Sequence, residues 1–180
     1  MASRSLSLSS PLLRFTLLAV GLYLLWFVGY EHYLAPDERL DTALTQNLAQ
    51  TSAGALRLLG FAATASTTPS PIISLGGQPL LSVWHPCNGL VLYALFSGFV
   101  VAFPGPIRTK LWFIPLGIFL IYCLNLVRVV VLALNSHYSQ QTVDFNHHYT
   151  FTFIVYACIF ALWMWWATRL AKPATAYAPA

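Results

Sequence analysis

The chain has 180 residues, of which 58% are hydrophobic and only 8% are charged, whereas about a quarter of the residues in a soluble domain are charged. Nine Lys and Arg with five Asp and Glu are too few to cover a soluble surface. The mean hydropathy of +0.67 indicates lipid as the main solvent. The net charge of +4 does not indicate a nucleic-acid partner, because the basic residues are scattered rather than clustered. Composition therefore predicts an integral membrane protein and excludes a soluble one.

Four apolar stretches predict an all-α polytopic membrane protein that forms a single integral domain over residues 1–180. The predicted transmembrane helices cover residues 12–30, 87–104, 111–134 and 149–168. The second is the shortest, and neighbouring residues must extend it if it is to cross a bilayer of ordinary thickness. We interpret the first as an uncleaved anchor rather than a signal peptide, because bulky residues follow it and no small-x-small cleavage site does.

Basic residues in the connecting segments predict the orientation of the chain. They are Arg4 and Arg14, Arg108 and Lys110, and Arg169 and Lys172. The positive-inside rule places all three groups in the cytoplasm. We therefore expect a multi-pass protein of the plasma (inner) membrane with both termini inside and residues 31–88 outside.

The outer segment has its own predicted elements. Apolar residues recur at three-to-four spacing between residues 37 and 60, after Pro36, which predicts an amphipathic helix on the membrane surface. A polar, Pro-containing linker follows. Two short apolar runs around Gly76 and Gly77 then predict a small hairpin over residues 72–83, which leads directly to Cys87.

Arg128 is the charged residue that lies inside a predicted span rather than in a loop, a tail or the edge of a span. An arginine in hydrocarbon costs roughly 2.5 to 3.5 kcal/mol on insertion scales and usually faces a bundle interior or a wet cavity. The alternative is snorkelling to the outer headgroups, about 10 Å away. The positive-inside rule disfavours a basic residue on that side, so a functional role is favoured. Tyr122, Asn125 and Asn135 share its helix face, where polar residues also serve as contacts between helices.

Cys87 is the candidate nucleophile. It lies where the outer segment enters the second span, and a helix N-terminus stabilises a thiolate. The alternative role, a small hydrophobic side chain, suits Cys123 and Cys158, which fall deep within the third and fourth spans. The wide spacing of the three cysteines indicates neither a disulfide framework nor a metal site.

His147 and His148 open the fourth span, and one of them is the candidate acid/base. Asp144 is close enough in sequence to orient one ring, while the alternative role for a histidine here is that of an interfacial polar residue. The predicted topology brings Cys87, Arg128 and this pair to the outer face. A nucleophile, a cation and an acid/base are the parts that acyl transfer needs.

These residues resemble the exosortase and archaeosortase family of membrane cysteine transpeptidases. The resemblance covers roughly residues 84–166, about half of the chain. It is carried by Cys87-Asn88-Gly89 at the opening of one span, Asn125-x-x-Arg128 in the next and a histidine at the opening of the last. Four spans are fewer than many members have, and the doubled histidine leaves the acid/base open.

The resemblance implies an enzyme that cleaves the C-terminal sorting signals of exported proteins, each made of a short motif, a hydrophobic helix and a basic tail. It implies Cys87 as nucleophile, Arg128 as essential cation and His147 or His148 as acid/base; Asn88, Asn125 and Asp144 are the supporting residues. The chemistry needs no cofactor or metal. The implied partners are the exported substrates, the bilayer and an acceptor, which is a glycan, a lipid or water.

Two other functions stay open from the sequence. In a non-enzymatic assembly factor of the membrane, the same polar residues would only hold helices together. In a metal or haem carrier, the ligands would come from His85, His137, His147 and His148, although no His-x-x-x-His pair or Cys-x-x-Cys motif supports it.

Overall fold

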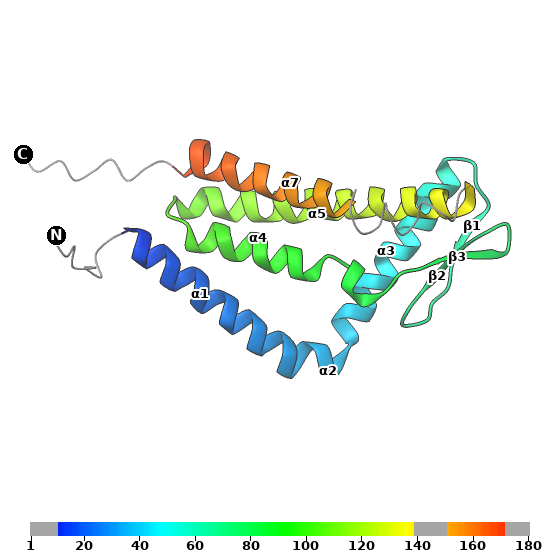
Figure 1. The fold of residues 1–180 in the computed structure, drawn as a ribbon, viewed down its shortest axis with the longest axis horizontal. Coiled ribbons are helices and arrows are strands. Elements are labelled where there is room, and N and C mark those ends of the chain that lie inside the picture. The colour runs from blue at the N-terminus through cyan, green and yellow to red at the C-terminus, as the bar shows by residue number, and fades with distance from the viewer. Residues whose placement is uncertain (1–10, 139–150, 172–180) are drawn as a thin grey trace, which may run out of the picture.

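A computed structural model describes residues 11–138 and 151–171, with the side chains of residues 12–138 and 153–171. The chain forms α1 (Pro11–Gly29), a π-helical turn (Tyr30–Leu34), α2 (Ala35–Asp37), α3 (Arg39–Leu58), the strands β1 (Ala63–Ala65), β2 (Ile72–Leu75) and β3 (Gln78–Ser82), then α4 (Leu90–Ala102), α5 (Ile107–Tyr138) and α7 (Phe151–Trp165) with a final π-helical turn (Trp166–Leu170). In Figure 1, α4, α5 and α7 lie side by side, and α3 crosses α5 at the end that carries the sheet.

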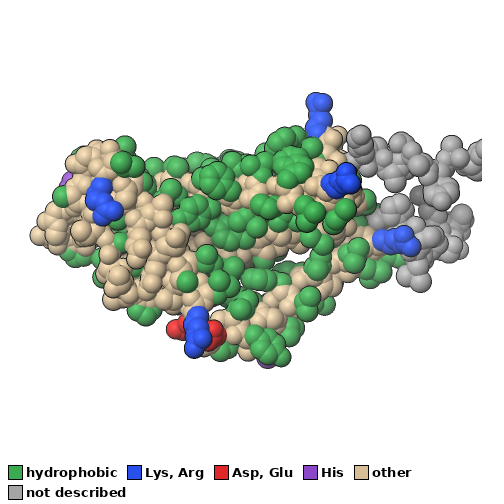
Figure 2. Space-filling model, turned by 180° about the vertical axis from the view of Figure 1, so that it is seen from behind, with side chains coloured by type: hydrophobic (Ala, Val, Ile, Leu, Met, Phe, Trp, Pro, Cys, Tyr) green, Lys and Arg blue, Asp and Glu red, His purple; other side chains and the backbone are tan. Residues whose placement is uncertain are grey.

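The predicted fold class, a polytopic helical membrane protein, is confirmed. Within the described ranges, three helices are long and apolar enough to cross a membrane: Leu12–Asp37, Ile107–Tyr138 and Phe153–Leu170. The first is a continuous helix of 26 residues that runs through α1, the π-helical turn and α2. Apolar side chains cover the visible face of this bundle (Figure 2), as a lipid-exposed surface requires.

The second predicted span is shorter than the sequence suggested. Its helix, α4, begins at Leu90 rather than at residue 87 and has 13 residues, a length of about 20 Å against about 30 Å for the hydrocarbon core of a bilayer. The three residues Cys87, Asn88 and Gly89 form a turn before the helix instead of its first turn. The dipole of α4 therefore starts beyond Cys87.

The amphipathic helix predicted over residues 37–60 is α3, and part of its predicted apolar stripe is buried. Of the leucines in that stripe, Leu48 and Leu56 are buried, whereas Leu40 and Leu59 are 39% and 60% exposed. The buried stripe is Asp41, Thr45, Leu48, Ala49, Ser52, Ala53 and Leu56. Its hydroxyls are satisfied inside the helix, since Thr45 donates to the Asp41 carbonyl and Ser52 to the Leu48 carbonyl. Small residues with satisfied hydroxyls let α3 approach its neighbours closely.

The predicted hairpin over residues 72–83 is present as β2 and β3, and a third strand joins it. Gly76 and Gly77 form its two-residue turn with positive φ angles of 55° and 83°, which a type I′ turn requires. β1, within the segment expected to be a linker, pairs with β2 in antiparallel register, Ala63 opposite Leu75. The sheet order is β1-β2-β3.

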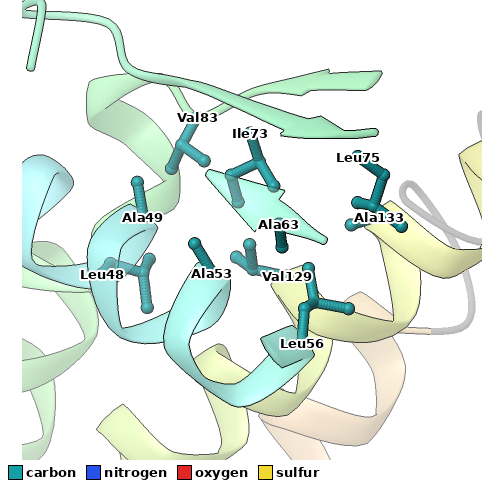
Figure 3. Close-up of a cluster of buried hydrophobic side chains, with 10 residues drawn as sticks. All are labelled: Leu48, Ala49, Ala53, Leu56, Ala63, Ile73, Leu75, Val83, Val129 and Ala133. Carbon is teal, nitrogen blue, oxygen red and sulfur yellow. The ribbon is translucent and has the colours of Figure 1, made fainter. Parts of the chain in front are cut away.

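α5 connects two separate cores. At the sheet end, Val129 and Ala133 pack with Leu48 and Leu56 of α3 and with Ile73 of β2, and Figure 3 shows these side chains converging between the two helices and the strands. The other core joins α4, α5 and α7. At 32 residues, about 48 Å, α5 exceeds the thickness of a membrane and so reaches both cores.

The core between α4 and α5 depends on a close approach at Gly117. A Cβ atom added there would lie 2.1 Å from the ring of Phe96, and Phe96 itself is fully buried against Phe113. The site has no room for a side chain.

We predict that Gly117→Ala lowers the free energy of unfolding by about 1–3 kcal/mol, because the Phe96 ring must leave its position in a packed core. The measurement is the midpoint of thermal unfolding of the purified chain in detergent. Gly98→Ala is the matched control, since nothing lies within 4 Å of a Cβ atom at Gly98 of the neighbouring helix. Equal midpoints for the two variants would contradict the close approach.

Candidate active site

Cys87 ends a 3-10 turn, His85–Cys87, that links the sheet to α4. Pro86 favours such a turn because its φ angle is fixed, and the amides of Cys87 and Asn88 donate to the carbonyls of Trp84 and His85, at 2.8 and 3.0 Å. The thiol is partly buried. The turn, rather than a helix, therefore sets the direction of the Cys87 side chain.

Two helices hold the peptide that follows Cys87. The Asn125 side chain of α5 donates to the Cys87 carbonyl at 2.6 Å. Asn88 is 4% exposed; its Oδ1 accepts from the Leu90 amide at 2.8 Å, and its Nδ2 donates to Asp41 Oδ1 of α3 at 2.5 Å. The turn is thus tied to α5, α4 and α3 by hydrogen bonds in a largely apolar setting, where unsatisfied polar groups are costly.

Gly89 completes the turn, and no other residue fits there without strain. Its φ angle is +84°, in the left-handed region that favours glycine. A Cβ atom would also lie 3.0 Å from the Tyr93 hydroxyl and 3.4 Å from Asn125 Nδ2. Glycine therefore permits both the reversal of the chain and the contact with Asn125.

Arg128 lies on α5 three residues after Asn125, hence on the same side of the helix. It is partly buried and lines the same small pocket as Cys87. Ser82, Val129 and nearby residues of β3 and α5 complete the lining. The structure therefore places Arg128 on the side of α5 that faces the candidate nucleophile, where both residues line one pocket.

The remaining predicted residues divide into two groups. His147, His148 and Asp144 lie outside the described residues, in the segment that leads to α7. Cys123 and Cys158 line an apolar pocket between α5 and α7, away from Cys87, as their predicted packing role requires. Among the side chains that the structure describes, no group of three or more His, Cys, Asp or Glu is arranged to hold a metal ion.

Sequence reasoning missed several polar groups around the turn. Asp41 is a buried carboxylate that binds Asn88, yet its position in the first turn of a helix indicates an exposed residue that complements the dipole. His85 Nε2 and the Tyr93 hydroxyl are buried without a hydrogen-bond partner in the part of the chain that the structure describes. Only the folded arrangement reveals them, because no spacing in the sequence marks these side chains as buried.

Comparison with known proteins then identifies the family. A family model described as transmembrane exosortase matches residues 5–165. The chain belongs to the exosortase family. A search of curated proteins and a search of solved structures found no significant match.

The exosortase match extends beyond the motifs that first indicated it. It covers α1, the sheet and all of α7, and it contains Cys87, Asn125, Arg128 and both histidines. The chain is therefore an exosortase-family membrane protein over most of its length, including α1, α3 and the sheet, which carry no motif of their own.

We predict that Asn125→Leu in this exosortase-family chain lowers the free energy of unfolding by about 1–3 kcal/mol, because it leaves the Cys87 carbonyl without its donor in a partly buried site. Tyr122→Phe is the matched control one turn earlier on α5. It removes hydrogen bonds to Asn47 and Thr51 at an exposed position, so we expect a loss under about 1 kcal/mol. Thermal unfolding in detergent measures both, and a larger loss in Tyr122→Phe would contradict the proposed anchoring by Asn125.

Proposed function

We propose that this chain is a membrane cysteine transpeptidase that cleaves the C-terminal sorting signals of exported proteins. The observation that carries the proposal is the pocket shared by Cys87 and Arg128, residues 41 positions apart that the turn and α5 bring together. A thiol beside a permanently charged guanidinium is suited to nucleophilic catalysis, because the cation can stabilise the negative charge that develops in the transition state. Membership of the exosortase family supports the same chemistry.

The proposed reaction has two halves. The Cys87 thiolate bonds to the scissile carbonyl carbon, and Arg128 stabilises negative charge on the oxyanion or on the thiolate. The carbon–nitrogen bond then breaks, His147 or His148 protonates the leaving amine, and a thioester remains. An acceptor amine, hydroxyl or water gives its proton to the histidine, attacks the thioester and releases Cys87.

The proposed orientation puts this site on the outer face of the plasma (inner) membrane. Arg14, Arg108, Lys110 and Arg169 lie near the start of α1, the start of α5 and the end of the last helix, which share the end of the bundle opposite the sheet (Figure 1). On the face seen in Figure 2, basic side chains lie at both ends, several of them at that end, whereas the acidic side chains lie toward the sheet end. The positive-inside rule then supports termini inside and the sheet and Cys87 outside.

We predict that Cys87→Ala abolishes cleavage of exported proteins that end in a hydrophobic helix and a basic tail, and that Arg128→Gln lowers it by about 100-fold or more. Intact masses of exported proteins, compared between cells that lack the chain and cells that express each variant, measure the cleavage. Cys123→Ala is the control, since Cys123 lies in an apolar pocket apart from the site. A Cys87→Ala chain that inserts normally and still supports cleavage would favour a non-enzymatic assembly factor and refute the enzyme.

The same assay assigns the acid/base. Loss of cleavage in only one of His147→Ala and His148→Ala identifies the histidine that acts, whereas full activity of the double variant would contradict the mechanism. A thioester trapped on Cys87, detected by mass and released by hydroxylamine, would distinguish covalent catalysis from direct attack by water.

We further predict that a Thr67→Cys variant is labelled by a membrane-impermeant maleimide in intact spheroplasts, and that an Arg108→Cys variant is labelled only after permeabilisation. Thr67 is exposed between β1 and β2, and Arg108 is exposed at the start of α5. The two substitutions are made in a chain whose native cysteines are replaced by alanine. The reverse labelling pattern would invert the proposed orientation.

A further inference from the structure

Asp41 is a carboxylate buried where a charge is hardest to accommodate. It lies in the first turn of α3, and only 3% of its surface is exposed. The ion pair found within the described residues joins Arg39 to Asp37, both exposed, and no described cation pairs with Asp41. A buried charge without a counter-ion needs hydrogen bonds to offset its lost hydration.

Those hydrogen bonds reach two other segments of the chain. Asp41 Oδ1 accepts from Asn88 Nδ2 at 2.5 Å, and Asp41 Oδ2 accepts from the Tyr30 hydroxyl at 3.2 Å. Tyr30 belongs to the π-helical turn after α1 and Asn88 to the turn before α4. One carboxylate therefore joins the end of the first span, the surface helix and the turn that carries Cys87.

The contact with Asn88 acts directly on the geometry of Cys87. The peptide between these two residues is planar and rigid. Its carbonyl, from Cys87, accepts a hydrogen bond from Asn125 of α5. Its amide belongs to Asn88, whose side chain donates a hydrogen bond to Asp41 of α3. Asn88 Oδ1 is already engaged by the Leu90 amide, so the carboxamide of Asn88 has one orientation that satisfies both of its ends. Without Asp41, one side of the peptide loses its anchor.

We propose that Asp41 is a positioning residue for Cys87: through Asn88 it holds the turn so that the thiol lies in the pocket that Arg128 lines. Its part in catalysis depends on the proposed function, whereas its hold on the turn does not. Asp41 holds the turn through the geometry of its hydrogen bonds and not through its charge. We therefore expect an uncharged side chain that forms the same hydrogen bonds to substitute for Asp41. Asparagine does so, because its Oδ1 accepts from Asn88 and its Nδ2 donates to the Tyr30 oxygen.

The first test measures alkylation of Cys87 by iodoacetamide in the full chain, in membranes, with Cys123 and Cys158 replaced by alanine. We expect Asp41→Leu to raise the rate by about tenfold, because the released turn exposes a partly buried thiol. Asp41→Asn stays within about twofold of the parent. Asp37→Leu, which removes an exposed carboxylate four residues earlier, leaves the rate unchanged. If Asp41→Leu does not insert, Asp41→Ser, with a side chain too short to reach Asn88, takes its place.

Two results would overturn the proposal. An unchanged rate in Asp41→Leu means that the carboxylate does not hold the turn. An equal rise in Asp41→Asn and Asp41→Leu means that the charge, not the hydrogen-bond geometry, governs the thiol.

The second test measures cleavage of an exported protein whose processing requires Cys87. Displacement of a nucleophile by about 1 Å can lower catalysis by about 100-fold. We therefore expect Asp41→Leu to lower kcat by about 10- to 100-fold with KM nearly unchanged, and Asp41→Asn to restore kcat, a rescue that general destabilisation does not produce. Full kcat in Asp41→Leu refutes the catalytic part of the proposal. If Cys87→Ala itself cleaves normally, the proposed function fails, while the alkylation result still decides whether Asp41 holds the turn.

Discussion

The hydrogen bond from Asn125 to the Cys87 carbonyl is the contact on which the rest of the candidate site depends. It joins the turn before α4 to the longest helix of the structure. Arg128 follows Asn125 by three residues, so it projects from the same side of α5. Whatever aligns Asn125 with the turn therefore also brings Arg128 to Cys87. Gly89 is needed because its φ angle is positive and a Cβ atom there would crowd the Tyr93 hydroxyl.

The unequal lengths of the helices explain why the turn needs so many partners. A short connection joins the end of α4 to the start of α5, and α4 has 13 residues whereas α5 has 32. The Cys87 turn thus lies beside Asn125, short of the far end of α5, and in this partly buried setting its polar groups need partners from the protein. α5 supplies Asn125 and α3 supplies Asp41 as partners, and α3 and the sheet pack on the sheet end of α5 in the core that Cys87 contacts. This arrangement also accounts for a carboxylate such as Asp41 in an otherwise apolar surrounding.

Much of the architecture follows from local patterns. Length and hydropathy predicted the helices at both ends of the chain, and the two glycines at residues 76 and 77 predicted the hairpin. Features that depend on neighbours were missed. The apolar stripe of α3 was predicted from its leucines, but its buried face combines Leu48 and Leu56 with small and hydroxyl residues, because close approach to α5 favours small volume at those positions. β1 was missed because a strand of three residues owes its conformation to pairing with β2.

The sequence by itself determined that the chain spans a membrane, that Arg128 is out of place among apolar residues, and that Cys87, Asn125 and Arg128 form a pattern typical of exosortases. The first two conclusions need only composition, spacing and the aversion of charge to hydrocarbon, which act on each segment independently, and the third rests on the resemblance of these motifs to a known family. The tertiary structure alone decided that Cys87 lies in a turn and not in a helix, that it shares a pocket with Arg128, and that Asp41 holds its neighbour. Those features arise where α3, α4 and α5 meet, and contacts between segments distant in sequence leave no periodic trace in any one of them.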